Sequence, residues 1–174
     1  DLATFEGTSG IGCISDSDPQ PLLVRSHLGV FALTTCGVIN NADALIEEYF
    51  ADHGNQFMAM SSGKVNETEL VAALINQEDD FVSGIKHVQE KVEGSMTLLL
   101  MTEEGNIIAA RDRLGRLPVL IGKNHEGYCA SFESFAYQKI DYETVYELGP
   151  AEIVNITADG YETLAPAGED MKIC

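Results

Sequence analysis

The stretch from Gly94 to Glu133 limits the possible folds of this chain more than any other. It contains four short runs of apolar and β-branched residues separated by clusters of turn-forming residues, a pattern that predicts consecutive antiparallel strands. We expect a four-stranded meander with strands at 96–101, 106–110, 119–122 and 128–131. The first two runs do not alternate apolar with polar residues, as a strand with one solvent-exposed face would. Both faces of these strands are therefore expected to be covered, which predicts a layered sandwich.

Three amphipathic helices are expected before this stretch, because apolar residues recur there every three or four positions. Their expected ranges are 42–51, 69–76 and 81–92. Asn40 or Asn41 is expected to cap the first helix, and Asn66 or Thr68 the second. Further short strands are expected at 11–14, 22–25, 30–35, 144–148, 152–157 and 161–164, with one helical turn at 133–137. The apolar faces of the helices need a surface to cover, so the strands on either side predict two sheets in an α+β fold.

The charge balance argues against two classes of partner. Twenty-eight Asp and Glu against ten Lys and Arg give a formal net charge of −18. Such a chain repels phosphate backbones and anionic lipid, so neither nucleic-acid binding nor membrane attachment is expected. No apolar run approaches the ~20 residues that cross a bilayer. The length of 174 residues suits one domain, with a core that needs no disulfide.

The four cysteines, at positions 13, 36, 129 and 174, form no C-x-x-C pair. Three of them lie in apolar segments, where a free cysteine packs as a small hydrophobic residue, so buried thiols in a reducing, cytoplasmic compartment are expected. The pair Cys36-Gly37 leaves a second interpretation open. A cysteine exposed near a helix N-terminus has a lowered pKa, and the Gly37 N–H there is able to face an anion. We find no phosphate-binding glycine loop, no metal-ligand spacing and no G-x-S-x-G motif.

Several motifs resemble those of one family. Residues 110–122, ARDRLGRLPVLIG, followed by ASFES at 130–134, resemble the paired A-R-D-x-x-G-x-x-P-L-x-x-G and A-S-E-S motifs of class II glutamine amidotransferase domains, most closely those of the amidophosphoribosyltransferase family. The resemblance extends along the chain in the same order. Residues 10–12 are similar to the family's G-I-G-H-x-R-Y segment, 35–41 to its H-N-G-N-L-x-N loop, 65–70 to its T-S-D-S-E-I helix start and 148–153 to its L-x-P-G-E-I segment.

The resemblance implies an α+β fold of the N-terminal-nucleophile (Ntn) hydrolase type, a four-layer αββα sandwich of two antiparallel sheets between helices. It implies a type-2-like glutamine amidotransferase domain at 1–165 that lacks its N-terminal part, and an exit segment at 166–174 towards a phosphoribosyltransferase domain. In this family an N-terminal cysteine attacks the side-chain amide of glutamine. The ammonia released is passed to the transferase, which makes phosphoribosylamine from PRPP in purine biosynthesis. This is nucleophilic acyl transfer, which needs an oxyanion hole.

The resemblance also assigns roles to three residues. Gly37 and Cys36 occupy the positions of the oxyanion hole, with Cys36 in place of the family's Asn, and Glu67 occupies the position of the Asp that binds the substrate ammonium group. A thiol is a weak donor, and loss of one oxyanion donor costs roughly 3–4 kcal/mol. The chain begins with Asp1 rather than Cys, and residues 12–18 lack the Arg that binds the substrate carboxylate. By itself the chain is therefore expected not to hydrolyse glutamine.

Three hypotheses for the whole protein remain open. The first is an active glutamine-dependent transferase with an altered pocket. The second is a regulatory or scaffold domain that keeps the fold without glutaminase activity, and the third is an unrelated small-ligand or partner-binding module. Expected partners are glutamine, the transferase domain and a second copy of the chain, because unpaired sheet edges seek partners. No cofactor is expected in this chain. The resemblance implies Mg²⁺ for the whole protein and, with Cys174 as one ligand, an iron–sulfur cluster.

Overall fold

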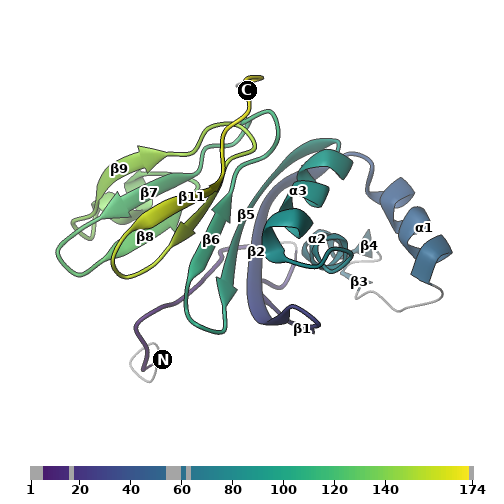
Figure 1. Ribbon diagram of the computed structural model, residues 1–174, viewed down its shortest axis with the longest axis horizontal. Coiled ribbons are helices and arrows are strands. Elements are labelled where there is room, and N and C mark those ends of the chain that lie inside the picture. Colours follow the sequence, from purple (N-terminus) through teal and green to yellow (C-terminus); the bar gives the residue numbers. More distant parts are fainter. Residues whose placement is uncertain (1–5, 16–17, 54–59, 62–63, 173–174) are drawn as a thin grey trace.

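The computed structural model describes residues 6–15, 18–53, 60–61 and 64–172. Within these residues, the strands form a six-stranded antiparallel sheet in the order β1-β2-β5-β6-β10-β11, a three-stranded antiparallel sheet in the order β8-β7-β9, and the short pair β3-β4 (Figure 1). In chain order the elements are β1 (Leu22–Ser26), β2 (Gly29–Ile39), α1 (Ala42–His53), β3 (Met60–Ser61), β4 (Lys64–Val65), α2 (Glu67–Ile75), α3 (Phe81–Lys91), β5 (Gly94–Thr102), β6 (Ile107–Ala110), β7 (Leu120–Lys123), β8 (Tyr128–Ser131), α4 (Phe135–Gln138), β9 (Glu143–Glu147), β10 (Ile153–Ile156) and β11 (Tyr161–Ala165).

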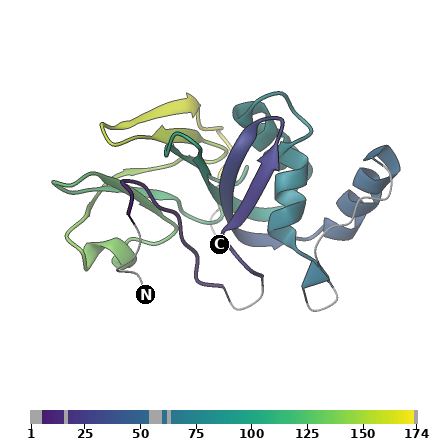
Figure 2. The same cartoon turned by 90° about the horizontal axis from the view of Figure 1, so that it is seen from below.

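Helices cover one face of the six-stranded sheet, and the three-stranded sheet covers part of the other (Figures 1 and 2). On the outer face of the small sheet, α4 places Tyr137 against β7. A Cβ atom on Gly122 would lie 3.1 Å from the Tyr137 ring, and the preceding residue, Ile121, points into the core between the sheets. The predicted stack of two antiparallel sheets between helices is therefore confirmed.

The central strands contribute to two separate cores. One core lies between the six-stranded sheet and α2 and α3, and the other lies between the two sheets. Successive residues of the same strand enter different cores. Leu98, Leu100, Ile108, Ala110 and Ile153 face the helices, whereas Leu99, Ile107, Ala109 and Val154 face the small sheet. This arrangement explains why these strands do not alternate apolar with polar residues, and it confirms that both of their faces are covered.

The predicted four-stranded meander is wrong at its middle. β5 pairs with β6, and β7 pairs with β8, but β6 and β7 belong to different sheets. The loop at 111–119 carries the chain across the sandwich, and β6 pairs with β10 instead. Two consecutive strands show the same pattern of apolar residues whether they pair within one sheet or lie in two stacked sheets. The sequence pattern alone therefore could not show that the chain crosses between sheets after β6.

Two other predictions need correction. Residues 11–14 are not a strand, and the expected loop at 35–41 is mostly strand, because β2 continues to Ile39. β2 pairs with β5 over nearly its whole length, from Phe31 opposite Thr102 to Ile39 opposite Gly94. The short strands β3 and β4 were not predicted. The other strands and the three longer helices begin and end within about three residues of their predicted bounds, a scatter expected at element ends.

Side-chain caps fix the starts of two helices. Asn66 Oδ1 accepts the N–H of Glu69 at 3.1 Å at the start of α2, as predicted for one of two candidates. Asp80 Oδ1 accepts the N–H of Ser83 at 2.9 Å at the start of α3. In the described part of the chain, no helix is both long and apolar enough to span a membrane.

Candidate functional site

The second half of β2 carries Cys36 and Gly37, the two predicted oxyanion-hole residues. Gly37 has φ of +148°, and a Cβ atom there would lie 1.9 Å from the carbonyl oxygen of Ser95 on β5. Real Cβ atoms do not approach an oxygen this closely, so only glycine fits at position 37. Because residue 37 has no side chain, a ligand is able to approach the main-chain N–H of Gly37 closely.

The N–H of Thr35 shows which way this part of β2 faces. It donates to Gln20 Oε1 at 2.8 Å, on the side of β2 away from β5. β1 pairs with β2 only as far as Leu33, so that side of β2 is not covered by β1 beyond this residue. N–H groups two residues apart in a strand point to the same side. The Gly37 N–H therefore points to the side that Gln20 occupies at Thr35.

A second contact brings β2 and the start of α2 together. The hydroxyl oxygens of Thr35 and Thr68 lie 2.7 Å apart and are buried. Cys36 follows the first of these residues, and Glu67 precedes the second. The contact thus joins the sequence neighbours of Cys36 and Glu67, and it brings the end of β2 close to the start of α2. Sequence reasoning did not identify Gln20, Thr35 or Thr68 as the residues that position the site, because hydroxyl and amide side chains in strands carry no distinctive pattern.

Cys36 is exposed, so the prediction of a buried strand thiol is wrong for this residue. Cys13 is also exposed, whereas Cys129 is half-buried. Partial desolvation raises the pKa of the Cys36 thiol, and the nearby Cys13 and Glu133 raise it further. The other interpretation, a thiol with a lowered pKa, is therefore also wrong. Cys36 remains protonated at neutral pH, and its S–H is a weak donor rather than a nucleophile.

The charges around this position favour a cation over an anion. Glu133 is close enough to influence the Cys36 thiol, and Glu67 lies at the start of α2. The segment 12–18 contains no basic residue. The arrangement is able to receive the ammonium group of an amino acid, and the Gly37 N–H is able to receive a negative oxygen. It lacks the bidentate arginine that would bind a carboxylate tightly.

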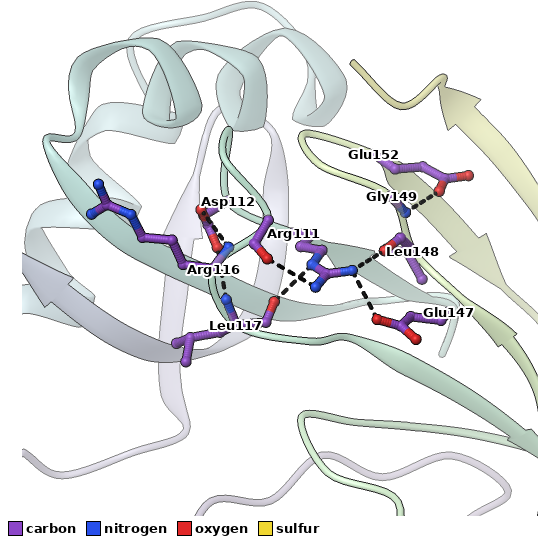
Figure 3. A network of polar contacts seen from close by, with 9 residues as sticks. Arg111, Asp112, Arg116, Leu117, Glu147, Leu148, Gly149 and Glu152 are labelled. Carbon is purple, nitrogen blue, oxygen red and sulfur yellow. Dashed lines mark hydrogen bonds and ion pairs between the residues drawn. The ribbon is translucent and has the colours of Figure 1, made fainter. Parts of the chain in front are cut away.

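The family-like motif at 110–122 has a structural role (Figure 3). Arg111 is 4% exposed, and its guanidinium donates to three main-chain carbonyls and one carboxylate. The acceptors are Leu117 O at 2.8 Å, Gly115 O at 2.8 Å, Leu148 O, and Glu147 Oε1 at 3.1 Å. Because the last two acceptors belong to the end of β9 and the turn after it, this side chain ties the crossing loop to the small sheet.

Asp112 shapes the same loop from within. Its carboxylate accepts the N–H groups of Leu114, Arg116 and Leu117 at 3.1–3.2 Å. Gly115 adopts a left-handed conformation with φ of +63°, which lets the loop turn back towards Arg111. The R-D-x-x-G signature is therefore explained by loop geometry and not by contact with the candidate site.

Glu152 organises the neighbouring turn in a similar way. It is 2% exposed, and its carboxylate accepts Gly149 N at 2.7 Å, the Tyr146 hydroxyl at 2.8 Å and the Thr163 hydroxyl at 3.1 Å. These donors come from β9, the turn after it, and β11. The glutamate of the family-like segment at 148–153 thus joins the edge of the large sheet to the small sheet.

A cavity of about 380 Å³ lies between the N-terminal segment at 8–12 and the edge of β8. Leu99 and Ile107 form part of its wall, and Cys36, Gly37 and Glu67 do not line it. Among the residues described, no group of three or more His, Cys, Asp or Glu is placed to hold a metal ion. Cys174, the expected cluster ligand, lies outside the described residues.

Two stacked antiparallel sheets with helices outside are the architecture of Ntn-hydrolase glutamine amidotransferase domains. A model of the family described as glutamine amidotransferase domain matches residues 10–136, and the chain belongs to this family.

Within the family, the chain is homologous to amidophosphoribosyltransferases. It is 31% identical over 137 residues to that of Methanocaldococcus jannaschii, covering 79% of this chain and 28% of the relative. It is 27% identical over 168 residues to the amidophosphoribosyltransferase of Archaeoglobus fulgidus, and this match covers 92% of this chain and 36% of the relative. The solved structure of glutamine PRPP amidotransferase from B. subtilis, in complex with ADP and GMP, superposes with a TM-score of 0.74 at 28% identity, covering 89% of this chain and 33% of that one. The chain thus spans about a third of the length of these relatives.

Proposed function

We propose that this chain is the glutamine-binding part of an amidophosphoribosyltransferase-like enzyme, in which ammonia from glutamine is used to form phosphoribosylamine from PRPP in purine biosynthesis. The observation that carries the proposal is the placement of the Gly37 N–H, on an uncovered side of β2, beside the residues that flank the Thr35–Thr68 contact. Homology to amidophosphoribosyltransferases over most of the chain supports it.

In the proposed reaction, a thiolate attacks the side-chain amide carbon of glutamine, and the carbonyl oxygen becomes negative. The Gly37 N–H donates to this oxygen, and the Cys36 S–H donates weakly. Ammonia leaves with a proton from a general acid, and water then hydrolyses the thioester to glutamate. Glu67 holds the ammonium group of the substrate. Because the pKa of each described cysteine is raised, we place the attacking thiol outside the described residues.

The test uses the full-length protein and the substitution Cys36→Asn. An amide donor in place of the thiol should raise the glutamine-dependent rate by about 10²-fold or more, because one good oxyanion donor is worth that much. The rate with free ammonia should not change, since it bypasses this site. Glu67→Gln should raise KM for glutamine with the ammonia rate again unchanged. If Cys36→Asn leaves the glutamine-dependent rate of an active protein unaltered, Cys36 does not contribute to the oxyanion hole.

A second candidate function is favoured by Cys36 itself. A weak donor at this position, with no arginine in the segment 12–18, suits a domain that keeps the fold for a regulatory or scaffold role. Absence of ammonia release from glutamine, in both the wild type and Cys36→Asn, with an intact ammonia-dependent reaction, would establish this role. Ammonia release by the wild type would exclude it.

The remaining proposals concern the whole protein. We propose that it is a cytoplasmic homo-oligomer in which this domain works with a phosphoribosyltransferase domain. We propose that any Mg²⁺ or iron–sulfur cluster of the whole protein is bound outside the described residues, among which no group of three or more His, Cys, Asp or Glu is placed to hold a metal ion. Sedimentation of the full-length protein and metal analysis of the purified protein test these points.

A further inference from the structure

A second cavity, of about 300 Å³, lies between α3, the start of β5 and the loop that follows β6. We call it the α3 cavity. Its polar lining residues include Gln89, Glu93, Arg113 and Arg116, and its apolar wall includes Val88 and Met96. It contains none of the residues assigned to the glutamine site. Its volume is at the lower end of the ~300–1,000 Å³ typical of small-ligand sites, so its ligand is small.

Gln89 lines this cavity, and its side chain is held in place by two hydrogen bonds of its own. It is 9% exposed, and its Nε2 donates to two main-chain carbonyls, Arg111 O at 2.9 Å and Ala151 O at 3.1 Å. These two hydrogen bonds fix Nε2 next to the main chain of Arg111 and Ala151, so the Oε1 atom lies on the opposite side of the amide group. Among the described residues, Oε1 has no hydrogen-bond partner. Because both amide hydrogens are used or held on the main-chain side and Gln89 lines the cavity, Oε1 is an acceptor available to an N–H group of a ligand.

Two arginines bring positive charge to the same cavity. Arg113 is exposed and Arg116 is half-buried, and neither guanidinium has a hydrogen bond or ion pair within the described ranges. Figure 3 shows the Arg116 side chain pointing away from the Arg111 cluster. The adjacent Asp112 does not neutralise them by direct contact, because its carboxylate is turned to main-chain N–H groups. In a chain with a net charge of −18, two unpaired arginines at one cavity favour a carboxylate or phosphate ligand.

Glu93 and the Gln89 oxygen decide between these anions. Both are acceptors, and Glu93 carries a negative charge, so a phosphate or sulfate would leave them facing like charge. A ligand with a carboxylate at one end and an ammonium group at the other pairs every group: the carboxylate with Arg113 and Arg116, and the ammonium group with Glu93 and Gln89 Oε1. The apolar wall then accommodates an aliphatic side chain. We propose that the α3 cavity binds a free α-amino acid with an aliphatic side chain.

The test is calorimetric titration of L-leucine into the full-length protein, with two analogues that each lack one charge. Leucinamide lacks the carboxylate, and 4-methylpentanoate lacks the ammonium group. We expect saturable binding of leucine, and binding weaker by about tenfold or more for each analogue, since each loses a charge-assisted hydrogen bond. Arg116→Gln and Glu93→Gln should each weaken leucine binding by a similar factor.

Lys86→Gln, on the exposed face of α3 and outside the cavity, is the matched control and should change leucine affinity less than twofold. Thermal unfolding of each variant shows whether it is folded. We expect unchanged unfolding temperatures, because the side chains of Arg116 and Glu93 make no hydrogen bond within the described residues. Three results would overturn the proposal: no saturable heat with leucine at tens of millimolar, equal binding of 4-methylpentanoate and leucine, or unchanged leucine affinity in both cavity variants. The glutaminase assay is a separate readout, so failure here leaves the proposed function untouched.

Discussion

Replacement of Arg111 tests whether hydrogen bonds to main-chain carbonyls, and not an ion pair, hold the crossing loop in place. In Arg111→Met the apolar volume is roughly kept while every donor is lost. The carbonyls of Leu117, Gly115 and Leu148 are then left without this donor. In Glu147→Gln, by contrast, the arginine keeps all three carbonyls and loses only the charge of its partner.

The expected magnitudes differ several-fold. Leaving a buried acceptor unsatisfied costs at least ~1 kcal/mol, so three carbonyls give about 3 kcal/mol for Arg111→Met. The side chain of Glu147 is 52% exposed, and a solvent-screened pair of this kind contributes at most ~1 kcal/mol, which is the upper limit for Glu147→Gln. Arg111→Lys should lie close to Arg111→Met, because an ammonium group cannot reach acceptors arranged around a planar fork.

Urea unfolding of the 174-residue chain measures these differences. With a slope near ~2 kcal/mol per molar urea, Arg111→Met should lower the midpoint by about 1.5 M, and Glu147→Gln by less than about 0.5 M. Equal losses for the two variants would mean that the ion pair dominates, and the reasoning from the carbonyls would be refuted. A small loss for Arg111→Met, below ~1 kcal/mol, would mean that water replaces the guanidinium without cost.

Other parts of the fold yield three further predictions. Gly37→Ala should destabilise the chain by at least ~2 kcal/mol in the same urea assay, because its Cβ atom meets Ser95 O, and a loss below ~0.5 kcal/mol would contradict this close approach. Asp80→Ala should cost about 1 kcal/mol at pH 7 by removing the cap bond to Ser83. Hydrogen bonds from Ser83 hold the pKa of Asp80 below its usual value, so this stabilisation is complete at neutral pH, begins to decrease near pH ~4 and is lost as the pH falls through the lowered pKa. The pKa of Cys36 lies above its ordinary value of 9.0, so its alkylation rate should keep rising beyond pH 9, and a plateau below pH 8 would contradict the raised pKa.

The layered architecture was predictable from the sequence, and the reason lies in the central strands. The run at 96–101 is apolar at nearly every position, which only a strand with two covered faces explains, and the structure divides these residues between two cores. The path of the chain between the sheets was not predictable. It depends on Arg111 and its acceptors at Glu147 and Leu148, which lie more than 35 residues away.

The candidate site was predictable only through its resemblance to a family. Cys36 and Gly37 carry no local signal that separates a strand from a loop. The raised pKa of the Cys36 thiol comes first from partial desolvation and then from Cys13 and Glu133, which are distant in the sequence. Glu67 at a helix start is expected of any acidic residue, because the helix dipole favours it there. The contact between Thr35 and Thr68, which joins β2 to the start of α2, could not be predicted from any sequence pattern.

The two glycines at the junction of β2 and β5 set the alignment of these strands. In most sheets a slip by one residue is prevented because it would turn apolar side chains into water. Both faces of β5 carry apolar side chains, so a one-residue slip would cost little by this mechanism. A Cβ atom on Gly37 would strike Ser95 O at 1.9 Å, and one on Gly94 would strike Val38 O at 2.1 Å. A pairing shifted along the strands would place a residue with a Cβ atom at one of these close approaches, so the two glycines favour the observed alignment and thereby fix where β2 ends relative to β5.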